Sequence, residues 1–104
     1  MSPEAPLAPA TALRQRAGVL HRELEGEAVL LDLEAGTYFG LNESGTRAWA
    51  LIGGGSTLGA VHATLAAEFD AAPERVWEDL VALARELLRN RLVEIAETSE
   101  DVET

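Results

Sequence analysis

The segment GEAVLLDLEAGTYFGLNESGTRAW, residues 26–49, decides the fold that we expect for this chain. Alternation between residues 28 and 33 predicts a largely buried strand, and Glu34-Ala35-Gly36 predicts a tight turn in which glycine supplies a positive φ. Residues 37–41 predict a second strand, after which Asn42 or Ser44 can cap a helix. A short sheet with an available edge can hold another peptide, so the segment favours a binding protein over an enzyme.

Composition narrows the class of function. The 104 residues fit one domain, and the formal net charge is −10, with every basic residue an arginine. An acidic surface repels phosphate backbones and anionic lipids, so nucleic-acid and membrane partners are disfavoured. The chain contains no cysteine, which excludes disulfides, thiolate zinc sites and cysteine nucleophiles. No apolar run is long enough for a membrane span and no signal peptide is evident, so we expect a cytoplasmic protein.

Local patterns predict the order of elements. We expect a flexible Pro- and Ala-rich arm over residues 1–16, a folded domain over 17–96 and an acidic tail over 97–104. The domain should contain a three-stranded antiparallel meander, three helices and a short terminal strand. We expect the strands at 19–24, 29–33, 37–41 and 92–95. We expect the helices at about 44–52, from Ser56 or Thr57 to Phe69, and at about 73–89. This is an α+β domain that resembles a winged helix-turn-helix. Asn90 can adopt the left-handed conformation that ends a helix.

Groups that could carry catalysis or hold a metal are few. His21 and His62 are the only histidines and have no acid–base or ligand partner at a recognisable spacing. Gly53-Gly54-Gly55-Ser56 is not followed by lysine, as a phosphate loop would require, and Ser44 has no accompanying base. We therefore expect no catalytic residue, no metal and no cofactor.

The third predicted helix is apolar over an unusually wide band. Two neighbouring stripes run along it, one through Val76, Leu80, Leu83 and Leu87 and the other through Trp77, Val81, Ala84 and Leu88. Together they span roughly 160°, more than the ~100° of a helix that serves one core. Either the helix is wedged between a sheet and other helices, or part of the band is the floor of a groove for a partner. Trp77 is a better binding candidate than Trp49, which we expect in the core.

Residues 29–42 (VLLDLEAGTYFGLN), residues 43–52 (ESGTRAWALI) and the third-helix pattern from Val76 to the final Leu92-Val93 resemble PqqD-like proteins. The resemblance covers roughly residues 18–96. One departure is Arg91, which stands where the family commonly has glycine before the final Leu-Val.

The resemblance implies a fold and a function. Such domains bind the leader segment of a ribosomally made precursor peptide as an added strand beside the third strand and the third helix, and present it to modifying enzymes. The partners would be a precursor leader and an enzyme such as a radical-SAM enzyme, a leader peptidase or a cyclase. The candidate leader-binding residues are Gly36, Thr37, Tyr38, Phe39, Gly40, Leu41, Val76, Trp77, Leu80, Leu83, Ala84 and Leu87.

Three other interpretations stay open at this point. The element order also suits a winged-helix DNA-binding regulator, although Glu74, Glu78, Asp79 and Glu86 lie among the arginines of its third helix. A small enzyme would need a nucleophile–base pair or metal ligands that the sequence does not offer. A scaffold subunit of a partner enzyme would use the same groove for a helix of that enzyme.

Overall fold

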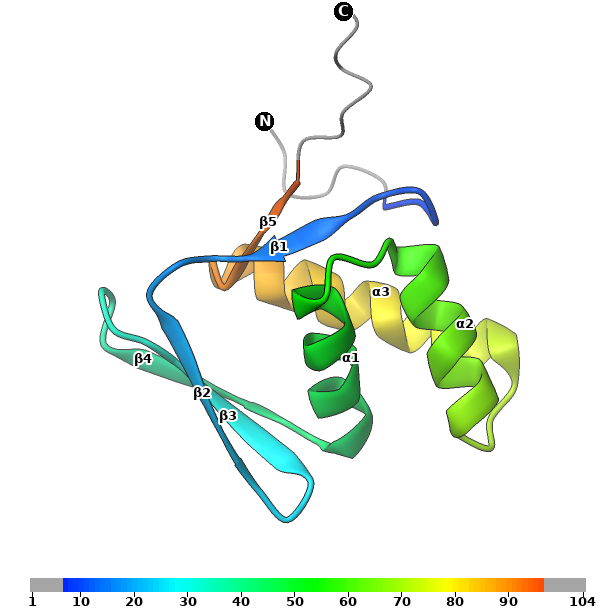
Figure 1. The fold of residues 1–104 in the computed structure, drawn as a ribbon, viewed down its shortest axis with the longest axis horizontal. Helices are drawn as coiled ribbons and strands as arrows, with labels where there is room; N and C mark the ends of the chain where they lie inside the picture. The colour runs from blue at the N-terminus through cyan, green and yellow to red at the C-terminus, as the bar shows by residue number, and fades with distance from the viewer. Residues whose placement is uncertain (1–6, 97–104) are drawn as a thin grey trace, which may run out of the picture.

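The fold is described from a computed structural model, in which residues 7–96 are placed. The chain forms a meander and three helices, closed by a second, two-stranded sheet (Figure 1). In chain order the elements are β1 (Leu13–Gln15), β2 (Val19–Leu24), β3 (Glu27–Asp32), β4 (Thr37–Leu41), α1 (Glu43–Gly53), α2 (Leu58–Glu68), α3 (Pro73–Arg89) and β5 (Val93–Ile95). The expected α+β architecture, with three antiparallel strands before three helices, is confirmed.

The meander has the strand order β2-β3-β4, with both pairs antiparallel. The β2–β3 turn holds only Glu25 and Gly26, both at positive φ, as a two-residue hairpin turn requires. Between β3 and β4 the strand ends at Asp32, one residue earlier than expected, and Gly36 has a positive φ. The early end follows from the carboxylate of Asp32, whose Oδ1 accepts from the backbone N–H groups of Glu34 and Ala35 at 3.0 and 3.2 Å.

Helix α1 lies between the meander and the other two helices, as Figure 1 shows. Of the two caps that the sequence offered, the structure selects Asn42, whose side chain accepts from the N–H of Gly45. Thr57 caps α2 in the same way, and Pro73 begins α3, as expected. The helices and the meander enclose one core, whose largest fully buried side chains are Leu30, Ile52, Leu58, Leu87 and Val61. Trp49 belongs to this core, as predicted.

The segment before residue 17 is not wholly an arm. Leu13–Gln15 form β1, which pairs with β5, and the side chain of Leu13 is buried in the core. The pairing satisfies backbone groups on both short strands, which neither could do alone. Residues 1–6 of the expected arm and the whole acidic tail, 97–104, lie outside the described residues.

The end of α3 corrects one prediction. Asn90 has a φ of −91°, and the left-handed residue is Arg91, with a φ of 60°. The N–H of Leu92 donates to the carbonyl of Leu87 and the N–H of Arg91 to that of Leu88, the paired bonds of a Schellman motif. That motif requires the left-handed residue one position beyond the cap, at Arg91, so the glycine usual in the family is replaced here without loss of the bend.

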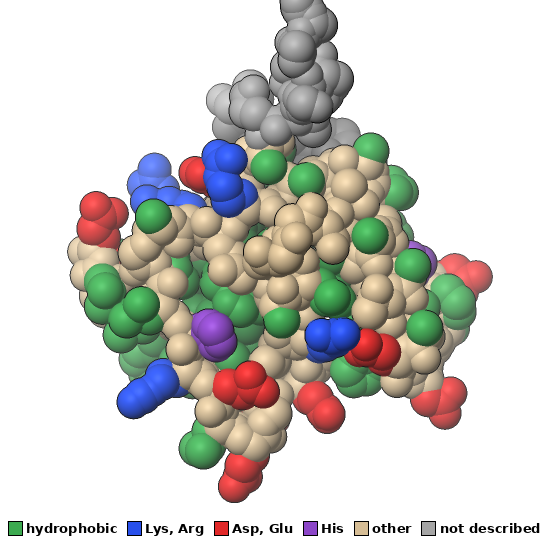
Figure 2. Space-filling model, viewed as in Figure 1, with side chains coloured by type: hydrophobic (Ala, Val, Ile, Leu, Met, Phe, Trp, Pro, Cys, Tyr) green, Lys and Arg blue, Asp and Glu red, His purple; other side chains and the backbone are tan. Residues whose placement is uncertain are grey.

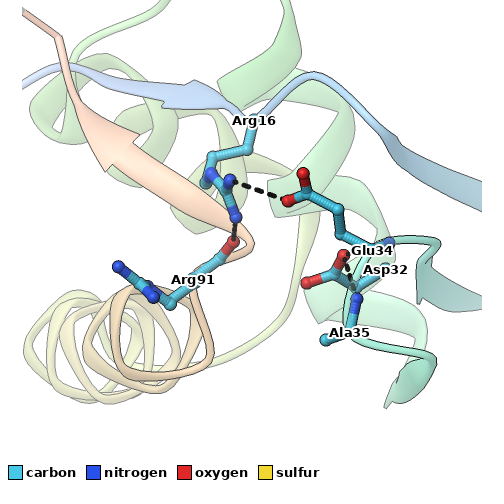
Figure 3. A network of polar contacts seen from close by, with 5 residues as sticks. All are labelled: Arg16, Asp32, Glu34, Ala35 and Arg91. Carbon is cyan, nitrogen blue, oxygen red and sulfur yellow. Dashed lines mark hydrogen bonds and ion pairs between the residues drawn. The ribbon is translucent and has the colours of Figure 1, made fainter.

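Arginine 16 joins three segments around this helix end (Figure 3). Its Nη1 donates to the backbone carbonyl of Arg91 at 2.7 Å, and its Nη2 lies 3.8 Å from a carboxylate oxygen of Glu34. The chain after β1, the turn between β3 and β4 and the end of α3 therefore meet at one side chain.

Candidate functional site: a groove beside β4

A groove of about 820 Å³ lies between the edge of β4 and helix α3. One wall is the end of β4 and the start of α1, the other is the first three turns of α3, and the floor comes from α1 and α2. The lining residues are Phe39, Gly40, Leu41, Asn42, Ser44, Gly45, Ala48, Leu65, Phe69, Asp70, Ala71, Val76, Asp79, Leu80 and Leu83. The groove is apolar at its base and carries two aspartates.

Half of the sequence-predicted binding residues line this groove. They are Phe39, Gly40, Leu41, Val76, Leu80 and Leu83. The strand residues and the helix residues come from opposite walls, so the fold brings together the two segments that the sequence singled out. Leu80 is buried, whereas Leu83 and Phe39 are half-buried and present more surface to the groove.

The other six candidates lie elsewhere. Ala84 and Leu87 are 0% exposed and belong to the core behind the groove wall. Trp77 is half-buried on another side of α3, where its ring meets His62 edge-on with centroids 5.4 Å apart. Gly36 lies in the turn and Thr37 at the start of β4, and Tyr38 turns its side chain to the opposite face of the sheet, 79% exposed.

The groove also contains residues that periodicity did not identify. The second helix was expected to reach Phe69, but α2 ends at Glu68, and Phe69 is its C-cap residue, extended and half-buried. Asp70 and Ala71 follow it in the corner before α3. The gap between the expected helix ending at Phe69 and the next one beginning at about residue 73 predicts a turn here, but not the surface that the turn borders.

The edge of β4 offers backbone groups to the groove. The two-residue turn makes Leu24 and Glu27 a hydrogen-bonded pair, so Glu27 directs its N–H and C=O to β2 and Ala28 directs its own to β4. By the same alternation, the N–H and C=O of Phe39, which lies opposite Leu30, point toward β3. Tyr38 and Gly40 then direct their N–H and C=O groups away from β3, and within residues 7–96 no further strand pairs with β4.

The described part of the chain shows neither a candidate metal site nor a helix that could span a membrane. Among residues 7–96, no group of three or more His, Asp or Glu side chains could hold a metal ion. None of the helices in that range is both long and apolar enough to cross a bilayer.

Known proteins share this fold. The model of the family described as coenzyme PQQ synthesis protein D (PqqD) matches residues 27–93. TbiB1, solved in complex with the TbiA(beta) leader peptide, is 30% identical with a TM-score of 0.74, covering 82% of this chain and 99% of that chain. Lasso peptide synthetase B1, complexed with the leader peptide, is 23% identical with a TM-score of 0.71, covering 78% of this chain and 95% of that chain, and supports the fold alone. No curated protein matches.

Proposed function

The chain belongs to the PqqD family, and from this premise we propose that it is a non-catalytic domain that captures the leader of a ribosomally made precursor peptide. The observation that carries the proposal is the groove between an unpaired strand edge and an apolar helix face. The similarity to a protein solved with a leader peptide supports the same conclusion.

Strand addition supplies the affinity in this proposal. The N–H and C=O groups of Tyr38 and Gly40 pair with an extended leader segment, which extends the meander by one strand. Each N–H or C=O that leaves water gains a partner in the leader, so the new hydrogen bond offsets the cost of desolvation. Gly40 leaves open space beside the new strand, because an added Cβ there would meet no atom within 4 Å.

Selectivity comes from the base of the groove. Side chains of an added strand alternate between two faces, so every second leader residue would point toward the helices. There it meets Leu65, Phe69 and Leu83. These contacts favour large apolar leader residues at alternate positions, each contributing about 1.5–3 kcal/mol if fully buried.

Charge adds a second preference. Asp70 and Asp79 line the groove, and the whole chain is strongly acidic. A leader with Lys or Arg beside its apolar residues complements this rim, and its association would slow as salt is raised. Leader binding that is indifferent to ionic strength would contradict the electrostatic part of the proposal.

The proposed role of the complex is presentation. A domain with no catalytic constellation contributes by holding the precursor for an enzyme, such as a radical-SAM enzyme, a leader peptidase or a cyclase. Because ribosomes make the precursor, the proposed site of action is the cytoplasm.

Amide NMR tests the leader assignment directly. The ¹⁵N-labelled protein is titrated with the leader encoded beside its gene, and hydrogen exchange is followed with and without the peptide. We expect shifts along β4 and the first turns of α3, with the amides of Tyr38 and Gly40 becoming protected while that of Phe39 is protected already. An unchanged spectrum of the folded protein, at saturating leader, would overturn the proposal.

The DNA-binding alternative finds less support. On α3, Arg75 pairs with Asp79 at 3.7 Å and Arg89 with Glu86 at 2.8 Å, so these guanidinium groups are engaged within their own helix. The net charge of −10 opposes a phosphate backbone as well. A gel-shift assay at low salt should show no retarded duplex, and a salt-sensitive complex would revive the alternative.

A further inference from the structure

The meander exposes apolar side chains on the face turned away from the helices. We call the outer sheet face the surface formed by Leu20, Leu24, Val29, Leu31 and Tyr38. The register joins three of them, because Leu20 lies opposite Leu31 and Leu31 lies opposite Tyr38, whereas the next row places Val29 between Arg22 and Gly40. Residues directly opposite in antiparallel strands share a face, so these three side chains form one apolar row across the whole meander.

This exposure is concentrated rather than scattered. Within residues 7–96, every exposed large apolar side chain except Ile95 comes from the meander or from the turn after β3. Leu24 is 77% and Tyr38 79% exposed, and on β3 the opposite face is buried in the core, whereas β2 is largely exposed on both faces. Single exposed apolar residues are ordinary, but a contiguous apolar face on a small acidic protein marks an interaction site.

We propose that the outer sheet face is the docking surface for the enzyme that modifies the captured precursor, and that the enzyme presents an apolar patch bordered by Lys or Arg. This inference rests on the proposed function, because it assumes that the groove holds a leader. The face and the groove are separate surfaces, since the side chain of Tyr38 points away from the groove that the backbone of β4 borders. Both can therefore be occupied at once.

Charge complementarity favours an enzyme with a basic rim as the partner that binds the outer sheet face. Carboxylates lie at both ends of the face, with Glu25 and Glu27 at one end and Glu34, which also lies 3.8 Å from Arg16, in the turn at the other. Arg22, opposite Val29, is the one cation on the described strands of the face. Figure 2 shows acidic and hydrophobic side chains over the meander, with a basic side chain and a histidine among them. A second copy would bring two such rims and two net charges of −10 together, whereas a basic-rimmed enzyme would neutralise them.

The geometry also couples the two surfaces. A leader strand added to β4 would place every second side chain on the same side as Tyr38, which extends the outer sheet face by one strand. An enzyme docked there would touch the domain and the leader together. Leader binding should therefore raise the affinity of the domain for the enzyme, and by linkage the enzyme should raise leader affinity by the same factor.

The test uses the full chain and the purified modifying enzyme encoded beside its gene, with affinity measured by biolayer interferometry. The double variant Leu20→Ser/Leu24→Ser removes apolar surface from β2, the strand farthest from the groove. Ile95→Ser is the matched control, because Ile95 is 51% exposed and Leu20 53%, and Ile95 lies on β5. We expect the affinity for the enzyme to fall by at least about tenfold in the double variant and to be unchanged in Ile95→Ser. The affinity for the leader should be unchanged in both variants.

Each outcome decides one question. Equal enzyme affinity of the double variant and the wild type, or an equal loss in Ile95→Ser, overturns the docking surface. If the wild type sediments as a dimer and the double variant as a monomer, the face binds a second copy, which also overturns the docking surface for the enzyme. If the leader does not bind but the double variant still loses the enzyme, the proposed function fails and the face is a docking surface for the enzyme without a captured precursor.

Discussion

The hydroxyl of Thr46 accepts a hydrogen bond from the backbone N–H of Ala28, with 2.9 Å between nitrogen and oxygen. Thr46 lies in the first turn of α1 and Ala28 on β3, and both are buried. The N–H of Ala28 faces β4 just where that strand ends at Leu41, so the ladder is continued by a side chain of the helix. This bond fixes the start of α1 against the sheet and thereby one wall of the groove.

Two substitutions of Thr46 distinguish the effect of its hydroxyl group on stability from the effect of its side-chain volume. Thr46→Val keeps the shape but leaves the buried N–H of Ala28 without its acceptor, which should lower the free energy of unfolding by about 1–3 kcal/mol. Thr46→Ser keeps the hydroxyl and loses one methyl group, at a cost of about 0.8 kcal/mol. Urea denaturation measures both, and a valine variant as stable as the serine variant would show that the bond contributes little.

The left-handed conformation of Arg91 gives a prediction of the opposite sign. Arg91→Gly should raise the free energy of unfolding by up to about 1 kcal/mol, because relief of a left-handed Cβ exceeds the backbone entropy that glycine loses. The carbonyl that accepts from Arg16 is kept in this variant. Arg91→Val serves as the contrast, since a β-branched residue is strongly disfavoured at a φ of 60° and should destabilise. If thermal unfolding shows Arg91→Gly to be less stable than Arg91→Val, the left-handed conformation of Arg91 would be contradicted.

Asp32 should control the turn that leads into β4. Asp32→Ala removes the acceptor of two backbone N–H groups and should cost about 1–3 kcal/mol, whereas Asp32→Asn retains an oxygen at the same place and should cost less. Amide exchange reports the change locally, because the N–H groups of Glu34 and Ala35 should exchange faster in the alanine variant. Unaltered exchange at both positions would mean that the turn is held by its backbone alone.

The groove wall offers a matched pair of substitutions on one helix. Leu83 and Leu88 are both half-buried on α3, but only Leu83 lines the groove. Leu83→Ser should weaken leader binding by about tenfold or more, through lost apolar contact, while Leu88→Ser should lower stability without changing leader affinity. Fluorescence anisotropy with a labelled leader measures both, after circular dichroism has shown each variant folded. Equal loss in the two variants would place the leader elsewhere.

The sequence predicted the elements better than the surfaces. The meander and the three helices have periodic patterns and identifiable caps, and each was found close to its expected place. β1 could not be predicted, because its residues lie in a Pro- and Ala-rich segment that was expected to be flexible, and their pairing with β5 exists only once the chain has folded. Propensity favoured Asn90 as the left-handed residue, but the hydrogen-bond pattern at the end of α3 imposed that conformation on Arg91.

The candidate site shows the same limit. Spacing identified β4 and α3 as its two walls, yet it could not tell which residues of a wide apolar band face the groove. Leu83 lines it, whereas Ala84 and Leu87 lie in the core behind it. Assigning those faces requires the position of α1, which packs against both the sheet and α3. Helical periodicity contains no information on that position.

The pair formed by Arg47 and Glu68 predicts how one contribution to stability depends on pH. The guanidinium of α1 meets the carboxylate of α2 through two hydrogen bonds, of 2.9 and 2.8 Å. These hydrogen bonds, assisted by the charge of Arg47 and opposed by desolvation, lower the pKa of Glu68 below its ordinary value. The same partner raises the pKa of Arg47, which stays protonated throughout.

Because the folded pKa of Glu68 is the lower one, the unfolded chain takes up the proton first as pH falls. The pair's contribution is therefore fully present at neutral pH and is lost as pH falls through and below the ordinary glutamate range. Carboxylate NMR should find the pKa of Glu68 depressed in the wild type and returned toward its ordinary value in Arg47→Gln. The difference in unfolding free energy between the two proteins should shrink over the same acidic range and with added salt, since both groups are partly exposed. A difference that stays constant from neutral to acidic pH would mean that Arg47 stabilises the helix pair by packing of its stem and not by its charge.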